Sequence, residues 1–383
     1  MSDAASGIPA TTGSWLQRVG DRFASRAHCS VIVGTGSHIP ASTVPNDSFL
    51  GHEFYDAQGR SYDKPNAEVI ALFQKITDIR ERRHAPGDQV ASDIACLAAQ
   101  DALDSSGIDK ESLDYVILAH NFGDVRPAGG QSDLVPTMAA RVKHKLGIRN
   151  PATVAYDVIF GCPGWLQGVI QADYYLRSGD ARRALVIGVD TLSRVSDPHD
   201  RDSMIYADGA GAVILEAVAS GQPAGVLAHV TRSDAADHAG LLHMGPSNKP
   251  GNGANGSYLK MDGRAVYEYA IETVPKVVKA CLDKVDLGLQ DVDKFLIHQA
   301  NAKMDEAILK RVGRLYGVRE VGPSLMPMTI SWLGNSSVAT IPTLLDLLRK
   351  GRLQGHDWRS GGIYVLASVG AGMNVNALAY RCP

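Results

Sequence analysis

Short apolar segments rich in β-branched residues alternate with longer segments of helical periodicity along most of the chain. The segments with strand character are residues 31–33, 115–118, 185–187, 212–215, 295–297 and 364–366. Because parallel strands are joined by helical crossovers, this alternation predicts an α/β fold with a largely parallel sheet. Residues 1–28 lie outside the pattern and are predicted to form an N-terminal extension.

The pattern occurs twice in the chain. Residues 102–104 align with residues 281–283, and residues 113–118 align at the same offset with residues 292–297. In each copy a helical segment precedes a buried strand. The recurrence predicts two related halves, residues 29–217 and residues 218–383.

Each half also contains a Gly followed by a polar residue that opens a helix, Gly161-Cys162 in the first and Gly334-Asn335 in the second. If a pseudo-twofold axis relates the halves, Cys162 and Asn335 lie at matching helix N-termini and face a shared interface. His298 follows the predicted strand of the second half, where it can join them. The sequence therefore predicts that a thiol, an imidazole and a carboxamide converge.

Cys162 has the local sequence of a nucleophile. Gly161 allows a sharp turn, and Pro163 suits the first turn of a helix, where its missing N–H has no partner to lose. A thiol at a helix N-terminus meets the positive end of the helix dipole, which favours the thiolate. We therefore predict a lowered pKa for Cys162.

The composition excludes several other classes of protein. The chain has 383 residues, of which 45% are hydrophobic and 21% charged, so it is long enough for two cores. A net charge of -3 argues against nucleic-acid binding. The first thirty residues lack a secretory apolar core, and no apolar run reaches the length of a membrane span, so we expect neither a secretory leader nor a span. Its scattered cysteines predict neither disulfides nor a metal site, and indicate the cytoplasm: Cys29, Cys96, Cys162, Cys281 and Cys382.

A Cys-His-Asn set also occurs in thiol proteases, where the Asn orients the His that activates the Cys. The sequence around Cys162 lacks the papain-type context. Acyl transfer through a thioester on Cys162 is therefore the favoured interpretation.

Seven motifs, in order along residues 30–381, resemble the β-ketoacyl-ACP synthase III family of the thiolase superfamily. They are Val31-Ile32-Val33-Gly34-Thr35-Gly36-Ser37 with Ile39-Pro40, Ile79-Arg80-Glu81-Arg82, the Cys162 segment, Asp197-Pro198 with Asp200-Arg201, Asp208-Gly209-Ala210-Gly211-Ala212, His298-Gln299-Ala300-Asn301, and Gly334-Asn335-Ser336-Ser337. The resemblance implies a thiolase-like fold of two pseudo-duplicated halves in α-β-α-β-α layers. It also implies a homodimer.

The same resemblance implies decarboxylative Claisen condensation. Cys162 would accept an acyl group, and the backbone N–H groups of Cys162 and Ala371 would form the oxyanion hole. His298 and Asn335 would donate hydrogen bonds to a malonyl or related β-ketoacyl thioester. Two alternatives remain open: acyl transfer to an oxygen or nitrogen acceptor, and a non-catalytic subunit of a heterodimeric ketosynthase.

The implied substrates are acyl thioesters on the phosphopantetheine arm of acyl-carrier protein or coenzyme A, with no bound cofactor. Arg201 and Lys303 match positions where the family contacts carrier phosphates. The segment 72–78 lacks the Trp and Arg with which the family clamps the adenine of coenzyme A, which favours acyl-carrier protein. The pathway, whether primary or secondary metabolism, the acyl chain length and the role of residues 51–65 are left open.

Overall fold

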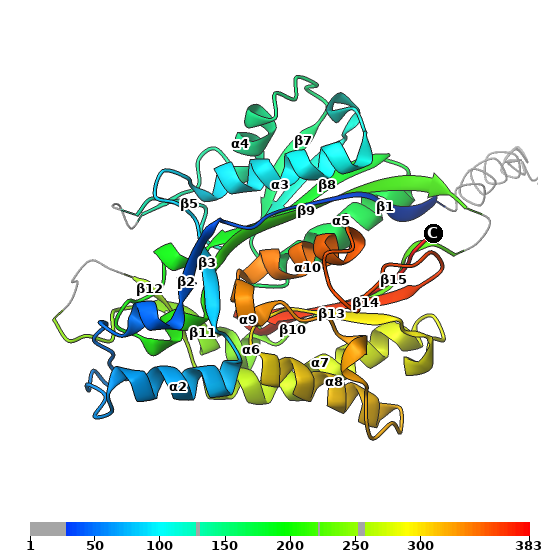
Figure 1. The fold of residues 1–383 in the computed structure, drawn as a ribbon. Coiled ribbons are helices and arrows are strands. Elements are labelled where there is room, and N and C mark those ends of the chain that lie inside the picture. Colours follow the sequence, from blue (N-terminus) through cyan, green and yellow to red (C-terminus); the bar gives the residue numbers. More distant parts are fainter. Residues whose placement is uncertain (1–27, 128–130, 221–222, 252–256) are drawn as a thin grey trace, which may run out of the picture.

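The computed structural model describes residues 28–127, 131–220, 223–251 and 257–383. Its helices and two main sheets form five layers, α-β-α-β-α, as Figure 1 shows. Almost all of the predicted N-terminal extension lies outside the described residues. His28 begins the first strand, β1 (His28–His38).

The first sheet has the strand order β1-β9-β8-β4-β7. The strands β4, β7 and β8 run parallel, whereas β9 pairs antiparallel with both β8 and β1. Their bounds are β4 (Tyr115–Ala119), β7 (Val154–Val158), β8 (Arg183–Thr191) and β9 (Asp208–Ala219).

The second sheet repeats this arrangement in the order β10-β15-β14-β13. Here β13 and β14 run parallel, and β15 pairs antiparallel with β14 and β10. The bounds are β10 (Gly225–Ser233), β13 (Lys294–Ile297), β14 (Ile363–Gly370) and β15 (Asn374–Arg381). The four strands of the second sheet repeat the order and orientation of β1-β9-β8-β4, and only β7 lacks a counterpart in that sheet, so the two halves are pseudo-duplicates.

All six segments predicted as strands are strands, but the prediction of a largely parallel sheet is wrong. Both sheets are mixed, because the chain returns from β8 to β9, and from β14 to β15, without a helical crossover. Such direct returns place neighbouring strands antiparallel.

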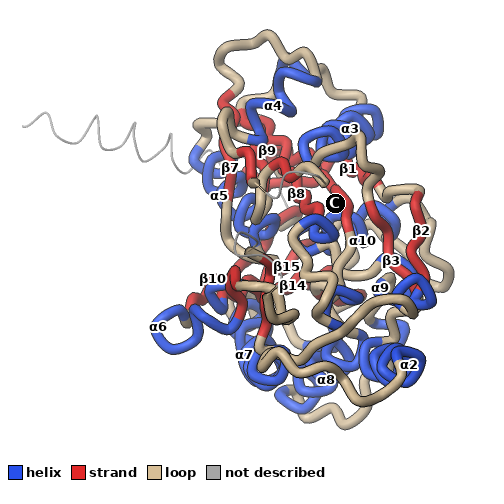
Figure 2. Tube along the Cα trace, turned by 90° about the vertical axis from the view of Figure 1, so that its left-hand side faces the viewer, coloured by secondary structure: helices blue, strands red, loops and turns tan. Residues whose placement is uncertain are grey.

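Helices fill the central layer and cover both outer faces, as the side view in Figure 2 also shows. The central pair is α5 (Gly164–Ser178) and α10 (Thr340–Arg349), and α10 buries apolar side chains on nearly every side. One outer layer is α3 (Ala91–Ser106) with α4 (Met138–Lys145), and the other is α7 (Gly263–Asp283) with α8 (Ala302–Leu315). Three apolar cores lie between these layers.

A fourth apolar cluster lies under smaller elements beside the layers. The elements that contribute to this cluster include β2 (Ser42–Pro45), α2 (Asn66–Thr77), β5 (Asp124–Val125), β12 (Tyr258–Met261) and α9 (Ile330–Leu333). The other small elements are β3 (Glu81–His84), β6 (Ser132–Asp133), α6 (Ala235–His238) and β11 (Leu242–Gly245). The first sheet ends with β9 and the second begins with β10. The predicted boundary at 217/218 lies inside β9, two residues before the strand ends, and stays a prediction.

Candidate active site

Cys162 lies in the tight turn between β7 and α5. Gly161 has a φ of 66°, and a Cβ added there would lie 2.6 Å from the backbone nitrogen of Ala371. A side chain at this position would therefore be strained and would also push the two backbone segments apart. Pro163 is the N-cap of α5, one position before the first turn in which the sequence placed it.

The ionisation of Cys162 differs from the prediction. Burial raises the pKa of the Cys162 thiol to about 11, and the nearby Asp190 carboxylate acts in the same direction. A hydrogen bond from Ser337 lowers the pKa but does not outweigh the burial. The predicted lowering of the pKa is therefore wrong, because the sequence cannot show how completely the thiol is removed from water. With this pKa the thiol is protonated near pH 7.

His298 directly follows β13 and is almost fully buried. Its backbone N–H donates to the carbonyl of Ala367, and its ring Nδ1 lies 2.7 Å from Oγ1 of Thr340. Burial lowers the pKa of His298 to about 4, so the ring is neutral near pH 7. Nδ1 is occupied by Thr340, which leaves Nε2 as the ring nitrogen available to the cavity.

Thr340 selects the tautomer of His298. Its Oγ1 also lies 3.0 Å from the backbone carbonyl of Ser337, and a hydroxyl has one proton to donate. When that proton points to Ser337, Nδ1 of His298 must be the donor and Nε2 is an acceptor. When it points to Nδ1, Nε2 carries the proton and becomes a donor. A small rotation of one hydroxyl therefore changes what the imidazole offers to a substrate.

Asn335 is held by its backbone and by its side-chain oxygen. Its backbone N–H donates to Ile205, its carbonyl accepts from Ala207, and its Oδ1 accepts from the N–H of Ser337 at 2.8 Å. The amide Nδ2 is consequently the group free to donate. A 3-10 turn, Ser337–Ala339, separates Asn335 from α10. The place of Asn335 before α10 therefore matches the place of Cys162 before α5 less closely than the sequence repeat predicted.

Arg82 supports the Asn335 loop from behind. A Cβ added at Gly334, whose φ is 71°, would lie 2.6 Å from Cβ of Arg82. The buried guanidinium donates to the carbonyls of Met204 and Val44 and to Oδ1 of Asn46. Burial lowers the pKa of Arg82 to about 10, so it remains charged near pH 7. The motif around Arg82 thus has a structural role.

One cavity of about 620 Å³ brings the predicted residues together: Cys162, His298, Asn335 and the backbone of Ala371 all line it. A Cβ added at Gly370 would lie 2.4 Å from the backbone nitrogen of Cys162, so the two backbone segments are in direct contact. The remaining lining is largely apolar and includes Ile76, Phe122, Leu192, Ile205, Leu242, Met244, Leu259, Met261 and Met304.

The two predicted carrier contacts lie apart. Arg201 lines a second cavity of about 870 Å³, which shares Ile205, Met261 and Asn301 with the first. Its guanidinium lies over the ring of Tyr62, which belongs to the segment 51–65. Lys303 lies in a separate depression between α2 and α8. The structure therefore does not unite them in one site.

Three polar residues beside Cys162 were not predicted. Oγ of Ser337 lies 3.5 Å from Sγ of Cys162, and Nδ2 of Asn121 donates to Oγ of Ser337 at 3.0 Å. Asn121 also donates through its backbone N and its Nδ2 to the buried carboxylate of Asp190. Ser337 stands in a motif that the sequence did single out. Asp190 ends a buried strand and gave no signal of its own.

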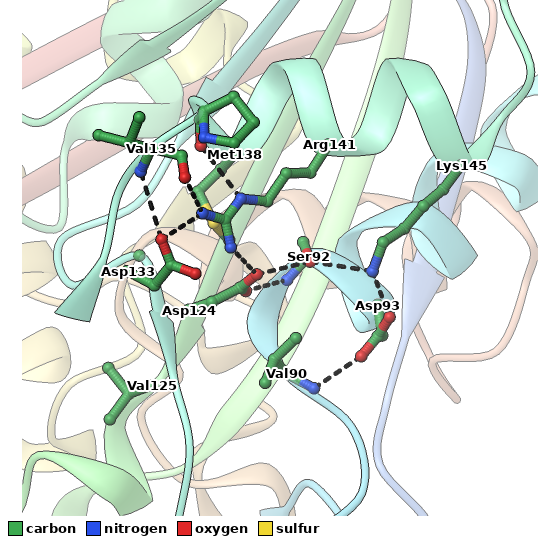
Figure 3. Close-up of polar contacts among 12 residues, drawn as sticks. Val90, Ser92, Asp93, Asp124, Val125, Asp133, Val135, Met138, Arg141 and Lys145 are labelled. Atoms are coloured by element: carbon green, nitrogen blue, oxygen red, sulfur yellow. Dashed lines mark hydrogen bonds and ion pairs between the residues drawn. The ribbon is translucent and has the colours of Figure 1, made fainter. Parts of the chain in front are cut away.

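The segment that carries Asn121 is anchored by a polar cluster on α3 and α4, shown in Figure 3. Asp124 accepts from the N–H and the hydroxyl of Ser92, and Arg141 donates to both Asp124 and Asp133. Lys145 donates to Ser92 at 3.0 Å. These contacts hold the loop after β4 against α3 and α4, and so help to position Asn121, which lines the same cavity as Cys162.

Two further features concern ligands and membranes. Among the described residues, no group of three or more His, Cys, Asp or Glu side chains is arranged to hold a metal ion. Likewise, none of the helices within the described ranges combines the length and apolar character that crossing a bilayer requires. All five cysteines are free thiols.

The five-layer fold and the Cys-His-Asn cavity define a thiolase-fold condensing enzyme, an acyltransferase. The family model of 3-oxoacyl-[acyl-carrier-protein] synthase III matches residues 156–235, and the model of its C-terminal domain matches residues 282–382. The chain belongs to the 3-oxoacyl-[acyl-carrier-protein] synthase III family.

Solved structures agree with this assignment. The synthase III of Pseudomonas aeruginosa is 30% identical, with a TM-score of 0.74 over 93% of this chain and 98% of that one. The enzyme of Thermus thermophilus is 28% identical, with a TM-score of 0.75 over 92% and 99%. The priming β-ketosynthase of a polyketide biosynthetic pathway is 26% identical, with a TM-score of 0.75 over 93% and 96%.

Proposed function

We propose that this condensing enzyme transfers an acyl group to Cys162 and joins it to a malonyl or related β-ketoacyl thioester by decarboxylative Claisen condensation. The observation that carries the proposal is the single cavity lined by Cys162, His298 and Asn335. Thiol, neutral imidazole and amide are the groups that this two-step chemistry needs.

In the acylation step, Sγ of Cys162 attacks the donor thioester. The oxyanion is held by the backbone N–H groups of Cys162 and Ala371, which belong to segments in direct contact. The apolar lining of the cavity accommodates the acyl chain.

In the condensation step, Nδ2 of Asn335 and Nε2 of His298 donate hydrogen bonds to the thioester carbonyl of the second substrate. Carbon dioxide leaves, and the carbanion, stabilised as an enolate, attacks the acyl group on Cys162. This role requires the Nε2–H tautomer of His298, so the hydroxyl of Thr340 must point to Nδ1. The low pKa of His298 keeps the ring neutral for this role.

Acyl-carrier protein is the proposed donor and acceptor of acyl groups. The cavity of Arg201 adjoins the catalytic cavity, and a guanidinium there can pair with the phosphate of a phosphopantetheine arm. Lys303, on a separate part of the surface beside Lys75, is assigned to contact with the carrier protein itself. A cytoplasmic location also stays a prediction.

A homodimer is proposed from the free edge of the first sheet. The strand β7 ends this sheet, and Val154 on β7 is 49% exposed. Three other apolar side chains of this half are also exposed: Val135, Ile159, which follows β7, and Tyr174 on α5. An uncovered strand edge with apolar neighbours favours pairing with a second copy.

The function is tested by intact-mass measurement of the protein incubated with acyl donors on acyl-carrier protein and on coenzyme A. We expect a covalent adduct on the wild type and none on Cys162→Ala. Asn335→Ala is expected to keep the adduct, but its rate of carbon dioxide release from malonyl carrier should fall by roughly 10²-fold or more.

Three results would contradict the proposal: an adduct on Cys162→Ala, condensation without carbon dioxide release from malonyl carrier, or full condensation by Asn335→Ala. The relative rates with the two donors separate acyl-carrier protein from coenzyme A.

A further inference from the structure

The antiparallel strands β11 and β12, hereafter the β11–β12 pair, form part of the wall of the catalytic cavity. Leu242 lies opposite Met261 and Met244 lies opposite Leu259, so these four side chains share one face of the pair. All four line the catalytic cavity. Lys260 projects from the other face and lines the second cavity. The β11–β12 pair therefore contributes an apolar face to the space proposed for the acyl chain.

This wall depends on its attachments to the rest of the protein. Among the described strands, β11 and β12 pair only with each other and belong to neither main sheet. An isolated pair of short strands is marginally stable in water. One backbone hydrogen bond joins the pair to the body of the protein, from the N–H of Leu259 to the carbonyl of Val195 at 2.8 Å. The position of the wall must therefore be fixed by side chains as well.

A buried ion pair between Lys260 and Asp197 supplies such an attachment. Nζ of Lys260 lies 2.5 Å from Oδ2 of Asp197, and the two side chains are 11% and 0% exposed. Nζ also donates to Oδ2 of Asp200 at 3.2 Å and to Oδ1 of Asn248 at 2.8 Å. An ammonium group has three protons to donate, and these three acceptors use them all. Lys260 therefore holds the protein together at this point and has no proton left for a ligand.

Asp197 also binds the segment that follows β11. Its Oδ1 accepts from Oγ of Ser247 at 2.9 Å, and its Oδ2 accepts from the backbone N–H of Asn248 at 2.6 Å. A further hydrogen bond comes from the N–H of His199 in the turn that carries Asp197 itself. One buried carboxylate thus holds β12 through Lys260 and the end of β11 through the two residues 247 and 248.

We propose that Lys260, held by Asp197, is a positioning residue that fixes the β11–β12 pair against the catalytic cavity and so limits which acyl groups fit on Cys162. The proposal rests on the proposed function of Cys162 as the acylated nucleophile. Removal of the ammonium group would leave the Asp197 carboxylate as a buried charge without its partner, which is costly. The strands would shift until water reaches that carboxylate, and their apolar face would move with them.

The test compares Lys260→Met with the wild type, and Lys249→Met is the matched control. Methionine keeps most of the length of the lysine side chain but carries no charge. Lys249 follows β11 in the same segment, and its ion pair with Glu53 is largely exposed, so that pair should contribute little. The rate of adduct formation on Cys162 is measured with butanoyl, octanoyl and dodecanoyl groups on acyl-carrier protein. Hydrogen–deuterium exchange of β11 and β12 and thermal unfolding are measured on the same proteins.

We expect Lys260→Met to lose selectivity among the acyl groups. The ratio of the fastest to the slowest rate should fall roughly tenfold or more relative to the wild type, because a hydrophobic pocket discriminates by its fit to the chain. Amide exchange in β11 and β12 should become faster. Lys249→Met is expected to keep the ratio and the exchange rates of the wild type. Ser247→Ala, which removes one hydrogen bond to Asp197, is a milder variant and should show the same changes at smaller size.

An unchanged ratio in Lys260→Met would overturn the proposal, and so would a wild type that reacts equally with all three acyl groups. An equal loss of rate with every acyl group would also overturn it, because a contact with the carrier acts on all of them alike. If Lys260→Met does not fold, the profile of Ser247→Ala decides in the same way. Absence of any acyl adduct on wild-type Cys162 would instead refute the proposed function, while amide exchange in β11 and β12 would still report on the ion pair.

Discussion

At the scale of single residues, the environment of each side chain decides its chemistry more than its identity does. Burial raises the pKa of Cys162 and lowers the pKa of His298, because it favours the neutral form of each side chain. The thiol is thereby harder to ionise, and the imidazole is kept neutral. The neutral imidazole suits the hydrogen-bond donor role proposed for His298.

The neutral state of His298 predicts a pH-dependent contribution to stability. Its pKa is about 4 in the folded protein and about 6.5 in the unfolded chain, so between these values the unfolded chain binds more protons. Stability therefore falls as the pH drops from 6.5 towards 4. At pH 5 the loss from this residue is roughly 2 kcal/mol.

Urea unfolding at pH 7 and pH 5 measures this effect, with His298→Gln as the reference because glutamine stays neutral. Between pH 7 and pH 5, the free energy of unfolding of the wild type is expected to fall by about 2 kcal/mol more than that of His298→Gln. Equal losses would show that His298 titrates normally in the folded protein.

At the scale of elements, the turn from β7 into α5 positions the two backbone N–H groups of the proposed oxyanion hole. We predict that Gly161→Ala lowers the rate of Cys162 acylation roughly tenfold or more. The added methyl group would displace the backbone of Ala371. The readout is the rate of adduct formation by intact mass.

Gly107→Ala is the matched control. Gly107 also has a φ of 66°, but a Cβ added there would meet no atom within 4 Å. Both variants should lose roughly 1 kcal/mol from the left-handed backbone, whereas acylation should fall only in Gly161→Ala. Similar acylation rates in the two variants would refute the role of this close approach.

At the scale of the whole molecule, the layered fold leaves β7 as an open edge. We predict that Val154→Asp converts the dimer to a monomer, because a charge would be placed in the proposed pairing surface. Sedimentation velocity measures the change. Leu315→Asp, at a similarly exposed apolar position on α8, should leave the dimer intact. A monomeric wild type, or a dimer that survives Val154→Asp, would contradict this interface.

The sequence by itself determined the strands, the internal repeat and the candidate residues Cys162, His298 and Asn335. These signals are local, because strand periodicity, a Gly before a helix and short motifs are each formed by neighbouring residues. Only the tertiary structure decided that the sheets are mixed, that Arg201 and Lys303 lie apart, and that burial raises the pKa of Cys162. It alone brought Ser337 to Cys162 across 175 positions of sequence. Burial and such contacts arise from segments distant in the chain, so no local pattern records them.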